Sequence, residues 1–198
     1  MDLIFLLDTS NSMAGTRINQ LNHAMLDVLS GIDYVSNQNS ETVNVRVISF
    51  NNVAKFVIGN ENGGIPIFRA CETWTNLVAK GTTDTAHAIR LCKKSIENDY
   101  LSSNTEKTVV ILVTDGHCDD RNEFDNAIGE TRNLISTMKS KNIYFTSVGV
   151  CDYEETELKK FAGLNDIAGW KTNFVKTIHM IDDISQLNSI IENTLINA

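Results

Sequence analysis

Two uninterrupted apolar runs constrain the fold of this chain more than any other feature of its sequence. Residues 3–7 read Leu-Ile-Phe-Leu-Leu and residues 109–113 read Val-Val-Ile-Leu-Val. A strand with one solvent-facing side alternates apolar and polar residues, so these continuous runs indicate strands buried on both faces. Such strands occur in largely parallel sheets that helices cover on each side. The runs are far too short to cross a bilayer.

Strand-like and helix-like patterns alternate along the chain, which is the order expected of right-handed βαβ units. Residues 60–66 are expected to form a loop, and Asn51-Asn52 predicts a hairpin because asparagine tolerates positive φ. We therefore expect an α/β fold: a doubly wound, Rossmann-like three-layer sandwich with a mostly parallel six-stranded sheet, one short antiparallel edge strand and helices on both faces. The predicted strands are residues 2–7, 42–50, 53–58, 108–113, 143–150 and 174–178. The predicted helices are residues 18–32, 85–97, 124–138, 154–162 and 184–195.

The length and net charge of the chain indicate the number of its domains and the partners that it is not expected to bind. A chain of 198 residues favours a single domain, here residues 1–198. The formal net charge of −8 repels phosphate backbones and anionic lipids, so nucleic acids and membrane surfaces are poor partners. No basic segment precedes residues 3–7, so this run is interpreted as a strand and not as a signal peptide.

Cysteine usage points to a reducing compartment. Cys71, Cys92, Cys118 and Cys151 are widely spaced, and the sequence has no Cys-x-x-Cys pair. We expect four free thiols, with a disulfide or a zinc site as the alternative. The sequence also contains no Asn-x-Ser/Thr glycosylation acceptor. Both observations predict a cytoplasmic location.

Hydroxyl and carboxylate side chains gather in three segments that the predicted topology brings together. Asp8, Ser10 and Ser12 follow the first apolar run, Asp115 follows the second, and Thr83 lies in a Gly-Thr-Thr-Asp-Thr segment between them. Ligands of doubly wound sheets sit beyond the carboxyl ends of the strands, where Asp8 and Asp115 are expected side by side. All five residues offer hard oxygen donors, which suit Mg²⁺. Taken singly, each segment is equally typical of helix caps and Asx turns.

Together, the three segments resemble the metal-ion-dependent adhesion site of the von Willebrand factor A domain family. The resemblance implies that Ser10 and Ser12 coordinate the ion directly, that Asp8 and Asp115 act largely through bound water, and that Thr83 completes the set. Neutral hydroxyl ligands leave the ion under-neutralised, so an open position attracts an external carboxylate. The expected ion is Mg²⁺, with Mn²⁺ or Ca²⁺ as alternatives, and the expected partner is a protein that supplies a Glu or Asp.

The resemblance implies a non-enzymatic interaction module, and two other functions compete with it. A Mg²⁺-dependent phosphoester-processing enzyme would need a second carboxylate or a nucleophile, but Ser10 stands two residues after Asp8. No Gly-x-Gly-x-x-Gly or Walker-type motif follows the first run. The second rival is a structural subunit of a larger ATPase or stress-defence complex. Residues 41–51 look similar to bacterial cytosolic members of the tellurium-resistance type, which the same resemblance links to stress response.

Several polar and aromatic residues near these segments have two interpretations. Residues 117–120 either form a second cation site or partner contact, or are a polar loop with a helix cap. His87 either faces the rim of the site or, as we expect, is a solvated helical residue. Residues 152–154 either shape specificity or, as we expect, cap a helix. Trp74 and Trp170 are interpreted as packing residues and not as binding anchors.

Overall fold

The computed structural model describes residues 1–102, 107–138, 142–151, 153–168 and 178–197. Its strands form one sheet in the order β3-β2-β1-β5-β6-β7, with β4 paired to β2. The five strands β2, β1, β5, β6 and β7 each run parallel to the next in this order, whereas β3 and β4 pair antiparallel to β2. The strands are β1 (Asp2–Asp8), β2 (Asn44–Phe50), β3 (Ala54–Ile58), β4 (Ile65–Pro66), β5 (Lys107–Thr114), β6 (Asn142–Val150) and β7 (Ile178–Ile181).

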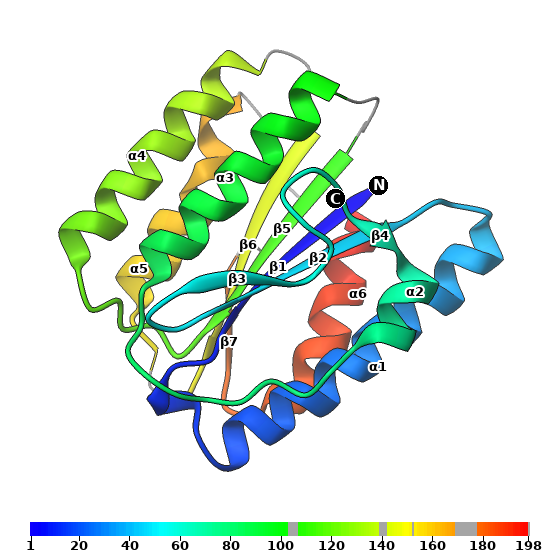
Figure 1. Cartoon of the computed structure of the whole chain (residues 1–198), viewed down its shortest axis with the longest axis horizontal. Helices are drawn as coiled ribbons and strands as arrows, with labels where there is room; N and C mark the ends of the chain where they lie inside the picture. Colours follow the sequence, from blue (N-terminus) through cyan, green and yellow to red (C-terminus); the bar gives the residue numbers. More distant parts are fainter. Residues whose placement is uncertain (103–106, 139–141, 152, 169–177, 198) are drawn as a thin grey trace.

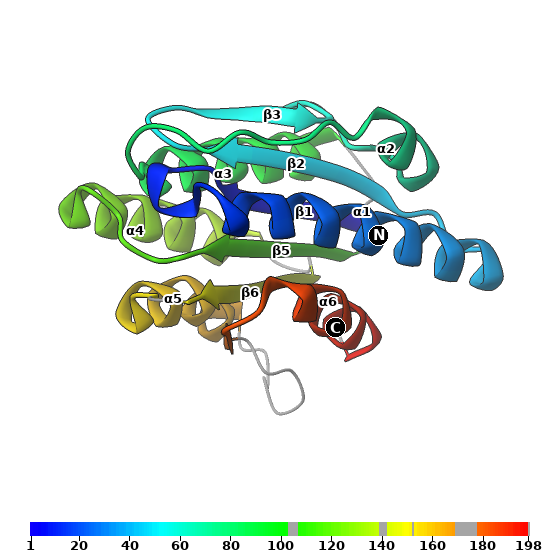
Figure 2. The ribbon, with the colours of Figure 1, turned by 90° about the horizontal axis from the view of Figure 1, so that it is seen from below.

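Helices cover both faces of this sheet, as expected for a doubly wound α/β fold. In Figure 1, α3, α4 and α5 lie on one side of the strands and α1, α2 and α6 on the other. Figure 2 shows α1 and α6 in front of the strands β1, β5 and β6. None of the helices in the described residues is long and apolar enough to span a membrane. The helices are α1 (Thr16–Asn39), α2 (Ile67–Thr73), α3 (Thr85–Ser102), α4 (Arg121–Thr137), α5 (Glu155–Ala162) and α6 (Leu187–Asn197), with short 3₁₀ segments η1 (Asn11–Met13), η2 (Gly163–Ala168) and η3 (Ile184–Gln186).

The central strands are apolar throughout because the sheet has a hydrophobic core on each face. Successive side chains of a strand point to opposite faces. In β1, Leu3, Phe5 and Leu7 pack with residues of α1 and α6, while Ile4 and Leu6 pack with residues of α3 and α4. All five side chains are fully buried. The predicted fold class and the two-sided burial of these strands are therefore confirmed.

The structure adds two elements between residues 60 and 84 that the sequence did not predict. The expected loop at residues 60–66 ends in the two-residue strand β4, which makes the sheet seven-stranded and not six-stranded. Helix α2 follows Pro66 directly. Neither element is long enough for its periodicity to show in the sequence. The strand predicted at residues 174–178 shares only Ile178 with β7, and residues 174–177 lie outside the described part of the chain.

The topology places the ends of β1 and β5 beside each other. The two strands are parallel neighbours, with Leu7 opposite Val113. Asp8 is the last residue of β1, and Asp115 directly follows β5. The expected adjacency of these two segments is confirmed, and it fixes where the polar residues meet.

Candidate metal centre

Asp8 is a buried carboxylate held by neighbouring hydrogen-bond donors. Its side chain is fully buried at the end of β1. Oδ1 accepts a hydrogen bond from the backbone N–H of Ser10 at 2.8 Å, and Oδ2 accepts one from the Thr114 hydroxyl at 2.7 Å. Burial raises the pKa of Asp8 from 3.8 to about 6, with a smaller contribution from the nearby charge of Asp115, although both hydrogen bonds act in the opposite direction. Asp8 is thus held in place at a site that disfavours its own charge.

Ser10 and Ser12 place two hydroxyl oxygens next to each other in the loop after β1. Their Oγ atoms are hydrogen-bonded to each other and lie 2.8 Å apart. Neighbouring ligands of an octahedral Mg²⁺ with bonds of about 2.1 Å are separated by roughly 3.0 Å. The observed spacing is therefore close to that of two adjacent ligands of one small cation. Ser10 is buried whereas Ser12 is exposed, so the pair spans from the interior to the surface.

The segment that contains Thr83 is attached to this loop by backbone hydrogen bonds. Asn11 N–H donates to the Gly81 carbonyl at 2.9 Å, and Lys80 N–H donates to the Thr9 carbonyl at 2.8 Å. Gly81 has a φ of 77°, and an added Cβ would overlap the side chain of Asn52. A glycine is required there because it adopts positive φ without strain and leaves room for that side chain.

Asp115 faces the first loop through an arginine that no sequence motif indicated. Arg17, in the first turn of α1, places Nη1 3.3 Å from Asp115 Oδ2 and 3.1 Å from the Ser12 carbonyl oxygen. Asp115 itself is buried. The only sequence signal for this role is a basic residue at the start of a helix, where the helix dipole disfavours positive charge.

Asp119 joins the Thr83 segment to the segment after β5. Thr83 N–H donates to Asp119 Oδ2 at 2.9 Å, and Asp119 N–H donates back to the Thr83 carbonyl at 3.0 Å. The three predicted segments are therefore joined by hydrogen bonds at the carboxyl edge of the sheet. All five residues predicted from the sequence lie in these segments, and Arg17, Thr114 and Asp119 are additions.

The donor set fits a hard divalent cation. The described residues contain no group of three or more His, Cys, Asp or Glu side chains arranged to hold a metal ion, so a site of the zinc-finger type is not present among them. The candidate centre instead combines two buried carboxylates, Asp8 and Asp115, with the paired hydroxyls of Ser10 and Ser12. Oxygen donors of this kind suit Mg²⁺, and the ion would add the positive charge that the two buried carboxylates lack.

A comparison against protein families identifies the family of this fold. The family described as von Willebrand factor type A domain matches residues 2–193. The chain belongs to this family. The comparison with curated proteins found no match.

Solved structures of other von Willebrand factor type A (vWA) domains share the fold at low sequence identity. A von Willebrand factor type A protein from Catenulispora acidiphila aligns with a TM-score of 0.71 at 17% identity, over 100% of this chain and 42% of that one. The BatB protein of Bacteroides thetaiotaomicron aligns with a TM-score of 0.65 at 14% identity, over 99% of both chains. Proximal thread matrix protein 1 from the mussel byssus, with a zinc-occupied metal-ion-dependent adhesion site (MIDAS) motif, aligns with a TM-score of 0.60 at 16% identity, over 98% of this chain and 44% of that one. This vWA chain therefore spans less than half of the first of these proteins.

Residues 116–120 of this vWA chain connect the candidate centre to α4 and α5. Asp120 accepts hydrogen bonds from the N–H groups of Asn122 and Glu123 and so caps α4, as the helix-cap interpretation predicted. Cys118 N–H donates to Glu157 Oε2 on α5 at 3.1 Å. Gly116 packs so closely on the backbone around Glu154 that no side chain fits between them. All four cysteines are free, as predicted.

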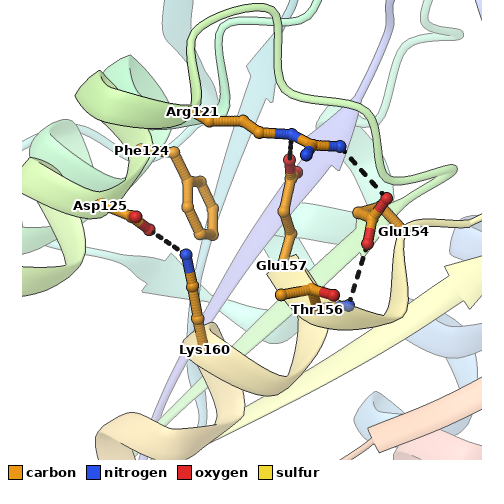
Figure 3. Close-up of a pocket in the computed structure, with 7 residues that line it drawn as sticks. All are labelled: Arg121, Phe124, Asp125, Glu154, Thr156, Glu157 and Lys160. Carbon is orange, nitrogen blue, oxygen red and sulfur yellow. Dashed lines mark hydrogen bonds and ion pairs between the residues drawn. The ribbon is translucent and has the colours of Figure 1, made fainter.

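A small pocket lies between α4 and α5, next to these residues (Figure 3). It has a volume of about 80 Å³ and is lined by two cations, three carboxylates, one threonine and Phe124. Arg121 pairs with Glu154 at 3.3 Å, and Lys160 pairs with Asp125 at 2.6 Å. The cations that line this pocket are therefore already paired with carboxylates that also line it.

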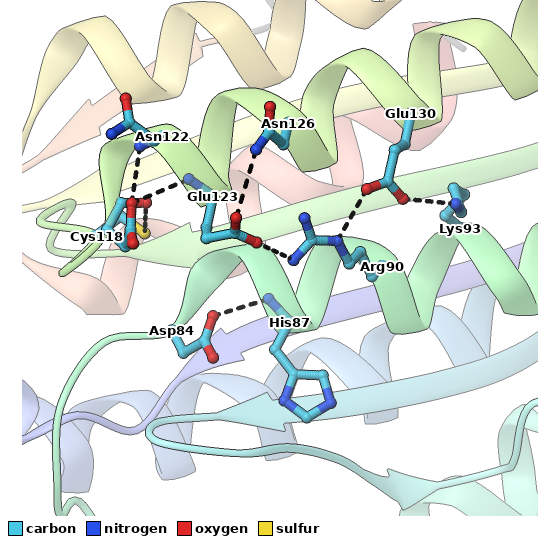
Figure 4. Close-up of polar contacts among 10 residues, drawn as sticks. Asp84, His87, Arg90, Lys93, Cys118, Asn122, Glu123, Asn126 and Glu130 are labelled. Carbon is cyan, nitrogen blue, oxygen red and sulfur yellow. Dashed lines mark hydrogen bonds and ion pairs between the residues drawn. The ribbon is translucent and has the colours of Figure 1, made fainter.

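The neighbouring face of α3 and α4 is also held by internal ion pairs (Figure 4). Arg90 contacts Glu123 at 2.8 Å and Glu130 at 3.1 Å, and Glu130 also pairs with Lys93. His87 differs from its prediction: it is half-buried, and its Nδ1 accepts a hydrogen bond from Ala54 N–H at 3.3 Å. It is a contact between α3 and the start of β3 and not a solvated residue. Trp74 packs against the hydrophobic core as expected, while Asp152 and Trp170 lie outside the described residues.

Proposed function

We propose that this vWA domain is a non-enzymatic interaction module that binds an acidic residue of a partner protein through a divalent cation. Asp8, Ser10, Ser12, Thr83 and Asp115 would hold the ion, with Mg²⁺ as the first choice and Mn²⁺ or Ca²⁺ as alternatives. When bound, the ion would act as a Lewis acid that accepts an oxygen of the partner's Glu or Asp carboxylate. The mussel relative with a zinc-occupied MIDAS motif supports the proposal that this site holds a divalent ion.

One observation carries the proposal: two buried carboxylates lie where neighbouring strands β1 and β5 end, and the loop after β1 carries a close pair of hydroxyl oxygens. Asp8 and Asp115 contribute two negative charges, and Arg17 contributes one positive charge. A divalent ion would offset the negative charge of these carboxylates. Because the hydroxyl ligands Ser10 and Ser12 are neutral, the ion would keep an attraction for an external carboxylate, which is why an acidic side chain is the proposed ligand.

The wider setting of the domain is part of the same proposal. Because the chain covers 42% of the Catenulispora protein, a domain of this kind also occurs within a longer chain. The alternative function is a structural subunit of a larger ATPase or stress-defence complex. The cytoplasmic location and the likeness of residues 41–51 to the tellurium-resistance type stay predictions. They do not affect the chemistry proposed for the centre.

The test is a thermal melt of the wild type and of Ser10→Ala, each with Mg²⁺ and with EDTA. We expect Mg²⁺ at a hundredfold excess over its Kd to stabilise the wild type by about 2.7 kcal/mol, which for a domain of this size raises Tm by roughly 5–10 °C. Ser10→Ala should lose most of that shift. Thr131→Ala on α4 changes a buried hydroxyl away from the centre and serves as the matched control. A wild-type melt that does not respond to any of the three cations would contradict the proposal.

A further inference from the structure

Arg17 occupies a position that the helix itself disfavours. Helix α1 begins at Thr16, and its N-cap residue Gly15 provides no side-chain cap. A positive charge in the first turn of a helix is unfavourable because it opposes the helix dipole. The structure contains a different reason for the arginine, because its side chain extends over the loops of the candidate metal centre.

The guanidinium of Arg17 lies between the buried carboxylate of Asp115 and the surface. Its Nη1 contacts Asp115 Oδ2 at 3.3 Å and the Ser12 carbonyl oxygen at 3.1 Å. The Arg17 side chain is 29% exposed, whereas that of Asp115 is 5% exposed. A ligand that approaches Ser12 from solvent therefore meets the charge of Arg17 beside the place where the ion would sit.

A positive charge at this position has opposite effects on the two ligands of the centre. It repels a divalent cation, because like charges at short range raise the energy of the bound state. It attracts a carboxylate, both by charge and because guanidinium donors match the two oxygens of a carboxylate. Removing the charge of Arg17 would lower the net charge of the loaded centre by one and so weaken its attraction for an acidic side chain.

We propose that Arg17 is a specificity-determining residue of this site: it weakens metal binding and strengthens the binding of the partner's carboxylate. The inference rests on the proposed function and adds that the acidic side chain is recognised by the guanidinium as well as by the ion. The competing explanation is that Arg17 only holds Asp115 in position. In that case its loss would weaken the binding of the metal and of the carboxylate together.

The experiment uses Mn²⁺ as the ion and acetate as the carboxylate. Water-proton relaxation measures Mn²⁺ binding, and it also reports the loss of a coordinated water when acetate enters. The variants are Arg17→Gln, which removes the charge but keeps amide donors, and Arg17→Lys, which keeps the charge. Arg132→Gln removes the same charge from an exposed position near the far end of α4 and is the matched control. Circular dichroism melts set a working temperature well below the Tm of each variant.

For Arg17→Gln we expect Mn²⁺ to bind about threefold to tenfold more tightly and acetate to bind about threefold to tenfold more weakly, as for the loss of one partly exposed charge. Arg132→Gln should stay within about twofold of the wild type for both ligands. Arg17→Lys, which keeps the charge but not the paired guanidinium donors, should stay within about twofold for Mn²⁺ and bind acetate with an affinity between those of the wild type and Arg17→Gln. Parallel losses for Mn²⁺ and acetate in Arg17→Gln, or no change in either, would overturn the inference while leaving the metal site intact. A wild type that binds no Mn²⁺ would instead overturn the proposed function.

Discussion

The hydroxyl of Thr114 donates a 2.7 Å hydrogen bond to Asp8 Oδ2 and so joins the last residues of two neighbouring parallel strands. The same hydroxyl accepts a hydrogen bond from Gly116 N–H at 2.9 Å. This short chain of polar contacts connects the end of β1 to the loop after β5 inside the protein. It positions a carboxylate whose burial raises its pKa to about 6. Asp8 is therefore well ordered but costly to ionise unless a cation is bound.

Replacing Asp8 with Asn is expected to have opposite effects on metal-free stability and on metal binding. In the folded state the pKa of Asp8 is raised from 3.8 to about 6, so the carboxyl contributes stability below pH 3.8 that is lost as the pH rises through 6. This shift corresponds to roughly 3 kcal/mol. In EDTA at pH 7, Asp8→Asn should therefore be more stable than the wild type by on the order of 2 kcal/mol.

Urea unfolding at two pH values distinguishes this effect from a general change in packing. The advantage of Asp8→Asn should shrink toward zero near pH 4, where the wild-type carboxyl is protonated. Added Mg²⁺ should stabilise the wild type but not the variant. A variant that is less stable than the wild type in EDTA at pH 7 would show that the hydrogen bonds of Asp8 outweigh the cost of its burial.

Metal affinity should depend on pH through the same carboxyl. The ion requires ionised Asp8, so binding must release its proton at low pH. Below a pH of about 6, the value to which the pKa of Asp8 is raised, we expect the apparent Mg²⁺ affinity to fall about tenfold for each pH unit. Calorimetric titration at pH 5 and pH 7, in buffers with different ionisation enthalpies, measures both the affinity and the proton release. Equal affinities at the two pH values would contradict the assignment of Asp8 to the site.

Four of the five site residues predicted from the sequence follow strong strand patterns, whereas Thr83 was predicted from the resemblance of its segment to the family. Residues 3–7 and 109–113 are uniformly apolar because each face of the sheet carries its own core, and these two patterns alone predict Asp8 and Asp115 at one edge of the sheet. Ser10 and Ser12 followed from their spacing after Asp8. These features are local, so one sequence is sufficient to find them.

The remaining residues depend on contacts between segments that are far apart in the chain. Thr114 belongs to the strand pattern of β5, and only the register of the sheet makes it a partner of Asp8. Arg17 reaches Asp115 across 98 positions of sequence. Helix α2 has seven residues, too few to show helical periodicity. In each case tertiary structure supplies the information that the sequence pattern lacks.

Gly116→Ala should disrupt the loop that carries Asp115. Gly116 has a φ of 94°, and an added Cβ would overlap the backbone nitrogen of Glu154. Backbone atoms cannot move aside as a flexible side chain can, so we expect a loss of about 3 kcal/mol or more in the free energy of unfolding. Metal binding should weaken as well, because Asp115 is the preceding residue.

Gly129→Ala is the matched control for that substitution. Gly129 lies within α4, and an added Cβ there has nothing within 4 Å. A glycine in the interior of a helix is less favourable than alanine by about 0.8–1.0 kcal/mol, so this variant should be slightly more stable than the wild type. Urea unfolding of both variants gives the comparison. Similar stabilities for Gly116→Ala and Gly129→Ala would show that the contact between residues 116 and 154 is not rigid.

A buried ion pair should make the other end of the sheet sensitive to single substitutions. Arg46 on β2 pairs with Asp99 on α3 through two hydrogen bonds of 2.6 and 2.7 Å, and its Nε also donates to the Asn60 carbonyl at 3.1 Å. Both side chains are buried. Asp99→Ala leaves a guanidinium buried without its counterion, so we expect a loss of about 3–5 kcal/mol. Glu61→Gln, which breaks the exposed pair with Lys94, should cost less than about 1 kcal/mol.

A double variant separates the pair from the packing around it. Arg46→Met with Asp99→Leu removes both charges while keeping apolar volume, and replacing a buried pair in this way is often neutral or stabilising. We therefore expect the double variant to be more stable than Asp99→Ala alone, as measured by urea unfolding at pH 7. If the double variant is instead the least stable, the hydrogen bond from Arg46 to Asn60 contributes more than the ion pair, because the methionine cannot replace it.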